Sequence, residues 1–369
     1  MSRSSGTAHL GGPPCYLLTA TGRLLARTPA APYLPAQQAA RDLRTAAAGT
    51  SLRIDGDGGP YDSWYLHLRG TADAPPRVLH AIAEVFAQYR HHSERQRADR
   101  RRAADALVTL LAAGPADGAA LQAALPACGL PTDGPYRVVV ATLGGDEPEG
   151  AVRALTEALR HEPGVPFAAG RLPGGEAVAV VHAGSEAPAE AASGAEPDPD
   201  PDARPDSGPG GSLADRWLAL HTCRPQAPLH AGVSAPVSAA GGLGSALDQA
   251  RYALAAARAQ APDGAQVRSV AELSTLGALL AGVPADVRRA FSNRVLGPLA
   301  HGGSASHRML LETLEVFLAH HGSWARTAEA LHLHVNTVHY RIQRIETLTG
   351  RDLSRLGDTL DLRAALWCR

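Results

Sequence analysis

The sequence predicts a multidomain α+β protein with a small α/β domain near the amino terminus, a ferredoxin-like middle domain and an all-α C-terminal region. Three observations support this fold class. Short apolar runs separated by turn residues occupy the first part of the chain. Strand and helix patterns then follow one another in the order β-α-β-β-α-β between residues 136 and 271. From Leu273 onward, the apolar residues follow helical spacing.

The composition favours a cytoplasmic protein. The four cysteines form no C-x-x-C pair, so we expect neither a disulfide framework nor a thiolate metal site. Residues 1–14 lack the apolar core of a signal peptide, and no apolar run is long enough to cross a membrane.

The net charge of −1 gives no global basic field, although a DNA-binding module can be locally basic. All 35 cationic residues are arginine, which indicates a GC-rich genome.

Residues 14–74 are predicted to form a small domain. Apolar runs on either side of Thr21-Gly22 indicate a β-hairpin, and Trp64–Arg69 indicates another strand. The order of elements resembles GAF- or PAS-like sensor domains, which makes this segment the candidate sensor of a small-molecule effector. The alternative is a generic small dimerisation domain.

Residues 75–113 are predicted to form a long connecting helix that starts at Pro75-Pro76. Its apolar positions have the spacing of a helix that packs on a partner, which predicts a homodimer or higher homo-oligomer. These positions are Leu79, Ile82, Phe86, Tyr89, Ala103, Leu107, Leu110 and Leu111. Between them, Arg95–Arg102 together with Arg90 supplies six basic residues. They form either a phosphate-contacting patch or, more simply, a solvated helix face.

The middle domain is predicted to span residues 136–271, with strands starting at Tyr136, Phe167, Glu176, Leu229 and Gln266. Residues 184–211 are rich in Pro, Gly, Ser, Asp and Glu. Such a segment cannot bury enough apolar surface to order itself, so we expect a disordered insertion.

The C-terminal region, 273–369, contains the most informative pattern, a helix-turn-helix within residues 307–369. Ser323 is a suitable N-cap for a helix over Trp324–Leu331, and His332–His334 forms the turn. The helix that follows is predicted to bury Val335, Val338, Ile342 and Ile345. Two flanking apolar sets would complete the bundle: Leu310, Leu311, Leu314, Phe317 and Leu318 upstream, and Leu353, Leu356, Leu360, Leu362 and Leu366 downstream.

The other face of this second helix has the chemistry of a DNA-recognition surface. The candidate DNA-binding residues are His334, Asn336, Thr337, His339, Tyr340, Arg341 and Arg344. Asparagine can pair with adenine edges, arginine with guanine or phosphate, and hydroxyl groups with phosphate oxygens. From Asn336 and Arg341 we expect roughly 1–3 kcal/mol each of specific binding. The alternative is an ordinary helical hairpin with Arg and His on its solvated face.

Residues 311–369 resemble the C-terminal helix-turn-helix of the PucR/CdaR family of bacterial regulators. The residues that carry the resemblance are Leu311–Leu314, Thr327–Glu329, Leu331, His334–Val338, Tyr340–Ile342, Arg344-Ile345, Leu348 and Gly350–Leu353, with Val295–Leu299 upstream. Gly232–Ser234, Gln249-Ala250 and Ala253-Leu254 resemble the GGDEF-like domain of the same family. The resemblance implies a regulator that binds double-stranded DNA, controls metabolic or developmental genes in response to an unidentified signal, and comes from an actinobacterium. The competing hypothesis is a scaffold protein whose helical C-terminus does not bind DNA.

Enzymatic and metal-dependent alternatives find little support in the sequence. A true GGDEF domain is a diguanylate cyclase whose signature hairpin would fall at Gly174–Val178, but the metal-binding carboxylate is replaced by Ala177. The histidines His332, His334 and His339 lack Cys or Asp partners at ligand spacing. We therefore expect no catalytic residues, no metal ligands and no cofactor.

Overall fold

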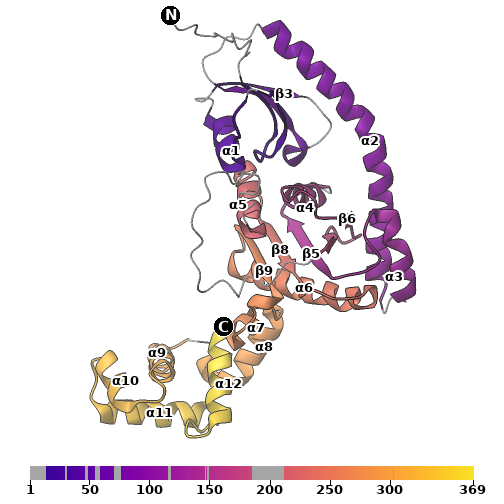
Figure 1. The fold of residues 1–369 in the computed structure, drawn as a ribbon. Helices are drawn as coiled ribbons and strands as arrows, with labels where there is room; N and C mark the ends of the chain where they lie inside the picture. The colour runs from indigo at the N-terminus through magenta and orange to yellow at the C-terminus, as the bar shows by residue number, and fades with distance from the viewer. Residues whose placement is uncertain are drawn as a thin grey trace, which may run out of the picture. The chain divides into compact units, whose positions relative to one another are not determined.

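The structure is a computed structural model, which describes residues 14–29, 31–45, 49–54, 59–69, 76–114, 118–145, 147, 149–184, 212–301 and 303–369. The chain divides into two compact units, 1–270 and 271–369 (Figure 1). The expected disordered insertion lies outside the described residues, apart from Gly184. No helix in the described part of the chain is long and apolar enough to cross a membrane.

The amino-terminal unit begins with a four-stranded antiparallel sheet in the order β2-β1-β4-β3. Its strands are β1 (Cys15–Thr19), β2 (Leu24–Arg27), β3 (Gly49–Ile54) and β4 (Trp64–Arg69). Gly22, at φ 82°, makes the predicted β1–β2 turn possible, because this backbone region disfavours residues with a Cβ. The strand β3 was not predicted from the sequence, whereas β4 has its predicted bounds.

The two faces of this sheet are covered by two helices. Tyr16 and Leu18 pack toward the side of α1 (Ala36–Thr45), with Leu34 and Ala39. Leu17 and Leu66 point to the opposite face, where Leu79 of α2 joins them. Alternate residues of β1 therefore serve different cores, as the period of two in a strand requires.

The long helix α2 (Pro76–Ala112) starts where the sequence predicted. The residues of its predicted apolar seam have three different environments instead of one shared interface. Leu79 is buried on the amino-terminal sheet, and Leu107 and Leu111 are buried in the middle domain. Ile82 and Tyr89 stay 36% and 66% exposed. The seam is therefore not a continuous surface for a partner chain, because much of it packs within this chain.

The middle domain has the predicted strands in a five-stranded sheet of order β6-β7-β5-β8-β9. The strands are β5 (Tyr136–Leu143), β6 (Phe167–Arg171), β7 (Ala177–His182), β8 (Leu229–Val233) and β9 (Ala265–Ser269). The first four pair antiparallel in ferredoxin-like order, and β9 adds a parallel edge strand. The helices are α3 (Gly118–Ala124), α4 (Gly150–Arg160), α5 (Leu213–Cys223) and α6 (Leu243–Gln260).

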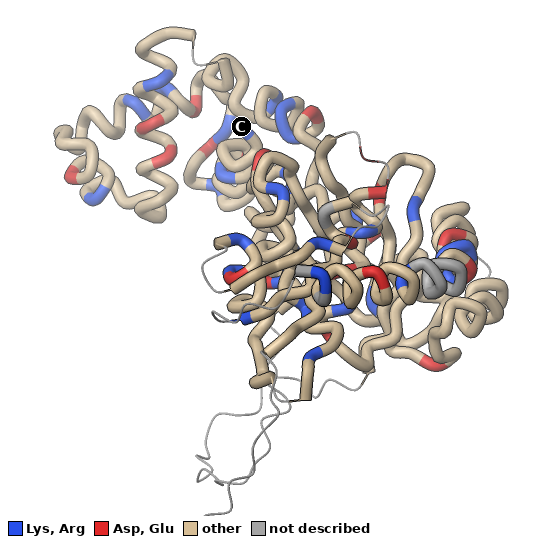
Figure 2. Tube along the Cα trace, turned by 90° about the horizontal axis from the view of Figure 1, so that it is seen from above, with Lys and Arg blue, Asp and Glu red and all other residues tan. Residues whose placement is uncertain are grey.

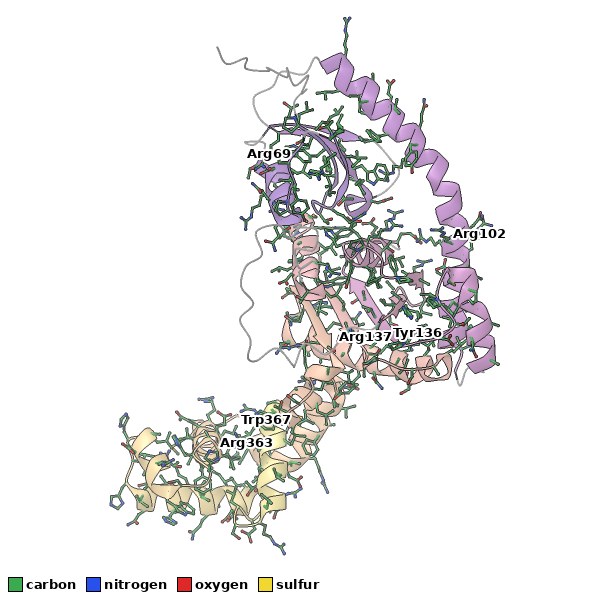
Figure 3. The ribbon with its side chains drawn as sticks, viewed as in Figure 1. Arg69, Arg102, Tyr136, Arg137, Arg363 and Trp367 are labelled. Atoms are coloured by element: carbon green, nitrogen blue, oxygen red, sulfur yellow. The ribbon has the colours of Figure 1, made fainter. Side chains whose placement is uncertain are left out.

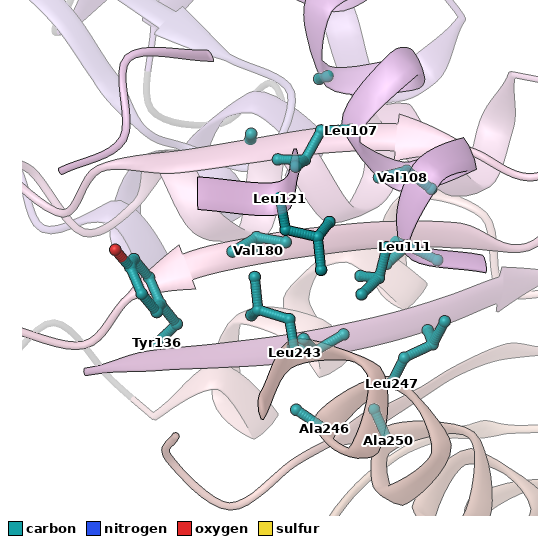
Figure 4. Close-up of a cluster of buried hydrophobic side chains, with 14 of the residues drawn as sticks. Leu107, Val108, Leu111, Leu121, Tyr136, Val180, Leu243, Ala246, Leu247 and Ala250 are labelled. Carbon is teal, nitrogen blue, oxygen red and sulfur yellow. The ribbon is translucent and has the colours of Figure 1, made fainter. Parts of the chain in front are cut away.

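Two apolar cores lie on opposite faces of this sheet. One contains Val138 and Val140 of β5 with the C-terminal half of α2, α3 and α6 (Figure 4). The other contains Val139 and Ala141 with α4 and α5. The helix α6 approaches β8 so closely that a Cβ on Gly232 would lie 2.0 Å from the Ala250 carbonyl oxygen. Two of the segments that resembled the GGDEF-like domain in sequence thus pack directly on each other.

The C-terminal unit consists of helices in its described residues. They are α7 (Leu276–Ala281), α8 (Ala285–Leu296), α9 (Ala305–Ala319), α10 (Trp324–Ala330), α11 (Val335–Thr349) and α12 (Leu356–Trp367). Their shared core contains the predicted upstream set of α9. The downstream prediction was partly wrong: Leu362 is buried, but Leu356 and Leu360 are 74% and 48% exposed. Val295, Leu296 and Leu299 take part in the core instead.

Candidate DNA-binding surface

A capped helix, a tight turn and a second capped helix form the helix-turn-helix. The Ser323 hydroxyl accepts a hydrogen bond from the backbone N–H of Arg326 and caps α10, as predicted. The chain reverses at His332, whose φ is 54°. His334 Nδ1 then accepts a bond from the N–H of Asn336 at 3.2 Å and caps α11. Gly350, in the left-handed conformation, ends α11.

The inner side of α11 is fixed by apolar packing. Val338, Ile342 and Ile345 are buried, and Ala328 of α10 is buried beside them. Val335 is only partly buried, so it closes the edge of the core. Because these three residues lie along one face of α11 and pack into the core, the rotation of the helix about its axis is determined, and so is the set of residues it presents to solvent.

The exposed side of α11 contains part of the predicted set. His334, Asn336 and Arg344 are exposed, Tyr340 is 70% exposed, and Thr337 is half-buried. Gln343 and Thr347 also lie exposed on this side. They were not among the residues predicted from the sequence, although their spacing of three and seven residues from Tyr340 places them on the same helix face.

His339 and Arg341 lie on the flanks of α11, where they contact the supporting helices. The His339 ring stacks on Trp324 with ring centroids 3.9 Å apart and an interplanar angle of 10°. Trp324 in turn contacts Phe317. On the other flank, Arg341 Nη1 donates to the hydroxyl of buried Thr313 at 3.1 Å. Arg341 is therefore half-buried, whereas His339 stays exposed as predicted although its ring stacks on Trp324. The DNA-binding role of both residues stays a prediction.

Basic and acidic residues are interspersed over this unit (Figure 2). Arg351 lies just beyond α11 and binds Asp358 at 2.9 Å and Asp361 at 2.7 Å. Its hydrogen bond to Asp358 is the main cause that raises the pKa of Arg351, and the same contact lowers the pKa of Asp358. Arg351 thus ties α11 to α12, whereas Arg344 is exposed on the candidate surface.

The residues of the cyclase-like hairpin and the three histidines of the helix-turn-helix have other roles in the structure. Ala177 and Val178 are fully buried in β7, and Glu176 binds Arg251 of α6 at 3.0 Å. Of the three histidines, His334 caps a helix, His339 stacks on Trp324, and His332 occupies the turn. Within the described residues, no group of three His, Cys, Asp or Glu side chains is placed to hold a metal ion.

Comparison with known proteins identifies two domains in this chain. Residues 310–368 match the PucR C-terminal helix-turn-helix domain, and residues 112–256 match the GGDEF-like domain. The chain therefore contains a GGDEF-like domain and a PucR-type helix-turn-helix domain, the latter formed by α9–α12.

Individual relatives are similar over short segments. An uncharacterised protein from Thermomonospora curvata is 54% identical over 19% of this chain and 38% of its own length. The transcriptional activator PmfR of Paenarthrobacter nicotinovorans is 36% identical over 28% of this chain and 23% of its own length. The purine catabolism regulatory protein of Bacillus subtilis is 38% identical over 24% of this chain and 16% of its own length. The matched segments thus span well under half of these relatives.

Proposed function

We propose that this chain is a DNA-binding transcriptional regulator of the PucR/CdaR type, which controls metabolic or developmental genes in response to a signal. The observation that carries the proposal is the outer face of α11. There, polar side chains with base- and phosphate-binding chemistry stand on a helix fixed by a buried apolar row. The match of this segment to a helix-turn-helix domain supports the same function.

In this proposal, α11 enters the major groove of double-stranded DNA. Asn336 and Arg344 are exposed and carry the groups that pair with adenine and guanine edges. Thr337, Tyr340 and His334 contact phosphate oxygens and set the orientation of the helix. His339 and Arg341 hold α11 on its supporting helices, and any DNA contact they make is secondary to that role.

The test begins by selecting bound fragments from genomic DNA with the purified chain and footprinting them. Asn336→Ala and Arg344→Ala should each weaken specific binding by roughly 1–3 kcal/mol, the usual contribution of a good base contact. The matched control is Arg289→Ala, an exposed arginine on α8 of the same unit. Footprints that persist unchanged in both variants would contradict the assignment. A failure of the chain to protect any genomic site would favour the scaffold alternative.

We further propose that the chain acts as a homodimer or higher homo-oligomer, because two modules supply the effective concentration that one lacks. Since part of the seam is buried within the chain, the surface available for a second copy is the exposed apolar side of α2. It consists of Ile82, Val85 and Tyr89. Val85→Asp should lower the molar mass measured by light scattering, whereas Ala106→Asp, also on an exposed position of α2, should not. A wild-type monomer at micromolar concentration, with and without DNA, would refute the oligomer.

We infer that the middle domain carries no cyclase chemistry. Ala177 supplies no carboxylate, its position is buried, and Glu176 beside it is held by Arg251. Two-metal phosphoryl transfer needs such ligands. Incubation of the purified chain with GTP and magnesium should yield no cyclic dinucleotide.

A further inference from the structure

A cavity of about 870 Å³ lies where three parts of the amino-terminal unit meet. One wall is formed by the amino-terminal domain, through Arg23 and Leu25 of the β1–β2 hairpin and Tyr61 of the short helical turn between β3 and β4. The second wall is α2 around residues 98–104, and the third is α4 with the start of β6. A volume of this size is typical of sites for small organic ligands. The Gly174-Gly175 hairpin tip is not among the lining residues, so this cavity is separate from the cyclase-like hairpin.

The charged lining of this cavity is mainly cationic. The arginines that line it are Arg23, Arg100, Arg101, Arg153 and Arg160. Against these five positive charges stand two carboxylates, Asp62 and Glu157. Both carboxylates are already engaged, Glu157 by Arg23 at 2.6 Å and Asp62 by Arg90 at 2.9 Å. Of the cations, Arg153 lies 3.4 Å from Glu147, a longer contact. A cleft lined mostly by charges of one sign attracts counter-ions of the other sign, so the lining favours an anionic ligand.

The environment of Arg101 shows how closely the cations are grouped. Burial lowers its pKa, as do the nearby charges of Arg153 and Arg171, while Asp105 acts in the opposite direction. Arg101 also forms an ion pair with Glu149. Leu25, Val152 and Phe167 complete the lining with apolar surface. The cavity therefore offers both guanidinium groups for anionic substituents and an apolar wall for the remainder of a ligand.

We propose that this cavity is the effector site of the protein and that it binds a small molecule carrying at least two anionic groups, either carboxylates or phosphates. The planar guanidinium group donates two parallel hydrogen bonds to such groups, which favours them over neutral ligands. This proposal depends on the proposed regulatory function only in that the ligand is called an effector. The binding of the anion itself can be measured without DNA.

The position of the site supplies a route for regulation. Its walls belong to the amino-terminal domain, to α2 and to the GGDEF-like domain. A ligand that contacts all three stabilises their arrangement, and it can shift an equilibrium only by its differential affinity for the two arrangements. The amino-terminal domain thus contributes one wall of the sensor in this proposal, and does not enclose the site alone.

The experiment is isothermal titration calorimetry on the full chain, with pyrophosphate and citrate as phosphate and carboxylate probes and glucose as a neutral probe, all at constant ionic strength. Arg100→Gln and Arg153→Gln test the site, because both side chains line the cavity. The matched control is Arg102→Gln. Arg102, labelled in Figure 3, lies two residues further along α2 than Arg100, is 80% exposed and pairs at the surface with Asp99.

At least one anionic probe should bind the wild type, while glucose should not. Arg100→Gln and Arg153→Gln should weaken binding roughly tenfold or more, the usual effect of removing a hydrogen bond to a charged group. Arg102→Gln should bind like the wild type. Preference for pyrophosphate or citrate identifies the phosphate or carboxylate class. Absence of binding by both anions, or equal weakening by Arg102→Gln, would overturn the site. DNA binding by the unliganded chain, measured separately, keeps this failure distinct from failure of the proposed DNA-binding function.

Discussion

The helix-turn-helix bundle and the amino-terminal unit use buried polar groups differently. In the C-terminal unit, α11 rests on an apolar core, and the Arg341–Thr313 bond joins residues only 28 positions apart. In the amino-terminal unit, Arg23 of the β1–β2 hairpin binds Glu157 of α4, 134 positions along the chain. The first arrangement is held by near neighbours in sequence, whereas the second depends on domains that must dock correctly.

The Glu157 cluster shows how specific that docking is. Thr21 donates to Glu157 at 2.7 Å, and its hydroxyl lies 2.8 Å from His161 Nε2. Burial raises the pKa of Glu157, but the charge and hydrogen bonds of Arg23, with the bond from Thr21, outweigh it and the net shift is downward. Burial also lowers the pKa of His161, to about 4, despite the nearby carboxylate. The hairpin thus contacts α4 through a buried polar cluster in which Arg23 and Thr21 stabilise the charged form of Glu157.

The largest expected effect tests the two halves of α2. Leu107→Ala removes a fully buried side chain from a core built from distant segments, so we expect a loss of about 2–5 kcal/mol in unfolding free energy. Glu84→Ala, at an exposed position of α2 outside the surface proposed for a second copy, should change it by less than about 0.5 kcal/mol. Urea denaturation of the full chain measures both. Similar losses in the two variants would mean that α2 is buried along its whole length.

The second prediction removes one member of the long-range ion pair. Arg23→Ala leaves the buried Glu157 carboxylate without its cation and should lower the unfolding free energy by about 3 kcal/mol. Arg53→Ala, an exposed arginine of the same domain, is the control and should have little effect. A stability equal to that of the wild type would show that the hairpin and α4 are not docked in this way.

The third prediction concerns pH. Because the folded His161 has a pKa near 4 against an ordinary value of 6.5, the unfolded chain takes up this proton first as the pH falls. Stability should therefore decrease between pH 6.5 and pH 5, by up to about 2 kcal/mol. Glu157, with its lowered pKa, contributes stability that is lost only at still lower pH. His161→Gln should flatten the pH dependence. Parallel slopes for His161→Gln and the wild type would refute the buried neutral histidine.

The smallest expected effect lies in the C-terminal unit. Arg341→Ala removes the bond to Thr313 and should cost about 1 kcal/mol of stability. Arg344→Ala should leave stability within about 0.5 kcal/mol of the wild type, because the side chain is exposed. Thermal unfolding followed by circular dichroism, combined with DNA titration, separates the two. The comparison would fail if Arg344→Ala destabilised the fold more than Arg341→Ala.

The sequence by itself determined the local elements of this protein. Ser323, the turn at His332–His334 and the apolar row of α11 identified the helix-turn-helix, because caps and helical periodicity act over a few residues. The same is true of β4 and of the ferredoxin-like succession of strands and helices in the middle domain. Strands are recognisable in the sequence because their alternating residues face two cores.

Only the tertiary structure decided which side chains remain available. Arg341 and Arg344 are equivalent in a helical pattern, but Thr313 of another helix engages the first and not the second. Likewise, Leu79 and Tyr89 share one seam, yet only Leu79 meets a sheet. The cavity arginines come from separate elements. Contacts between distant segments depend on how the elements pack, and spacing within one element carries no information about them.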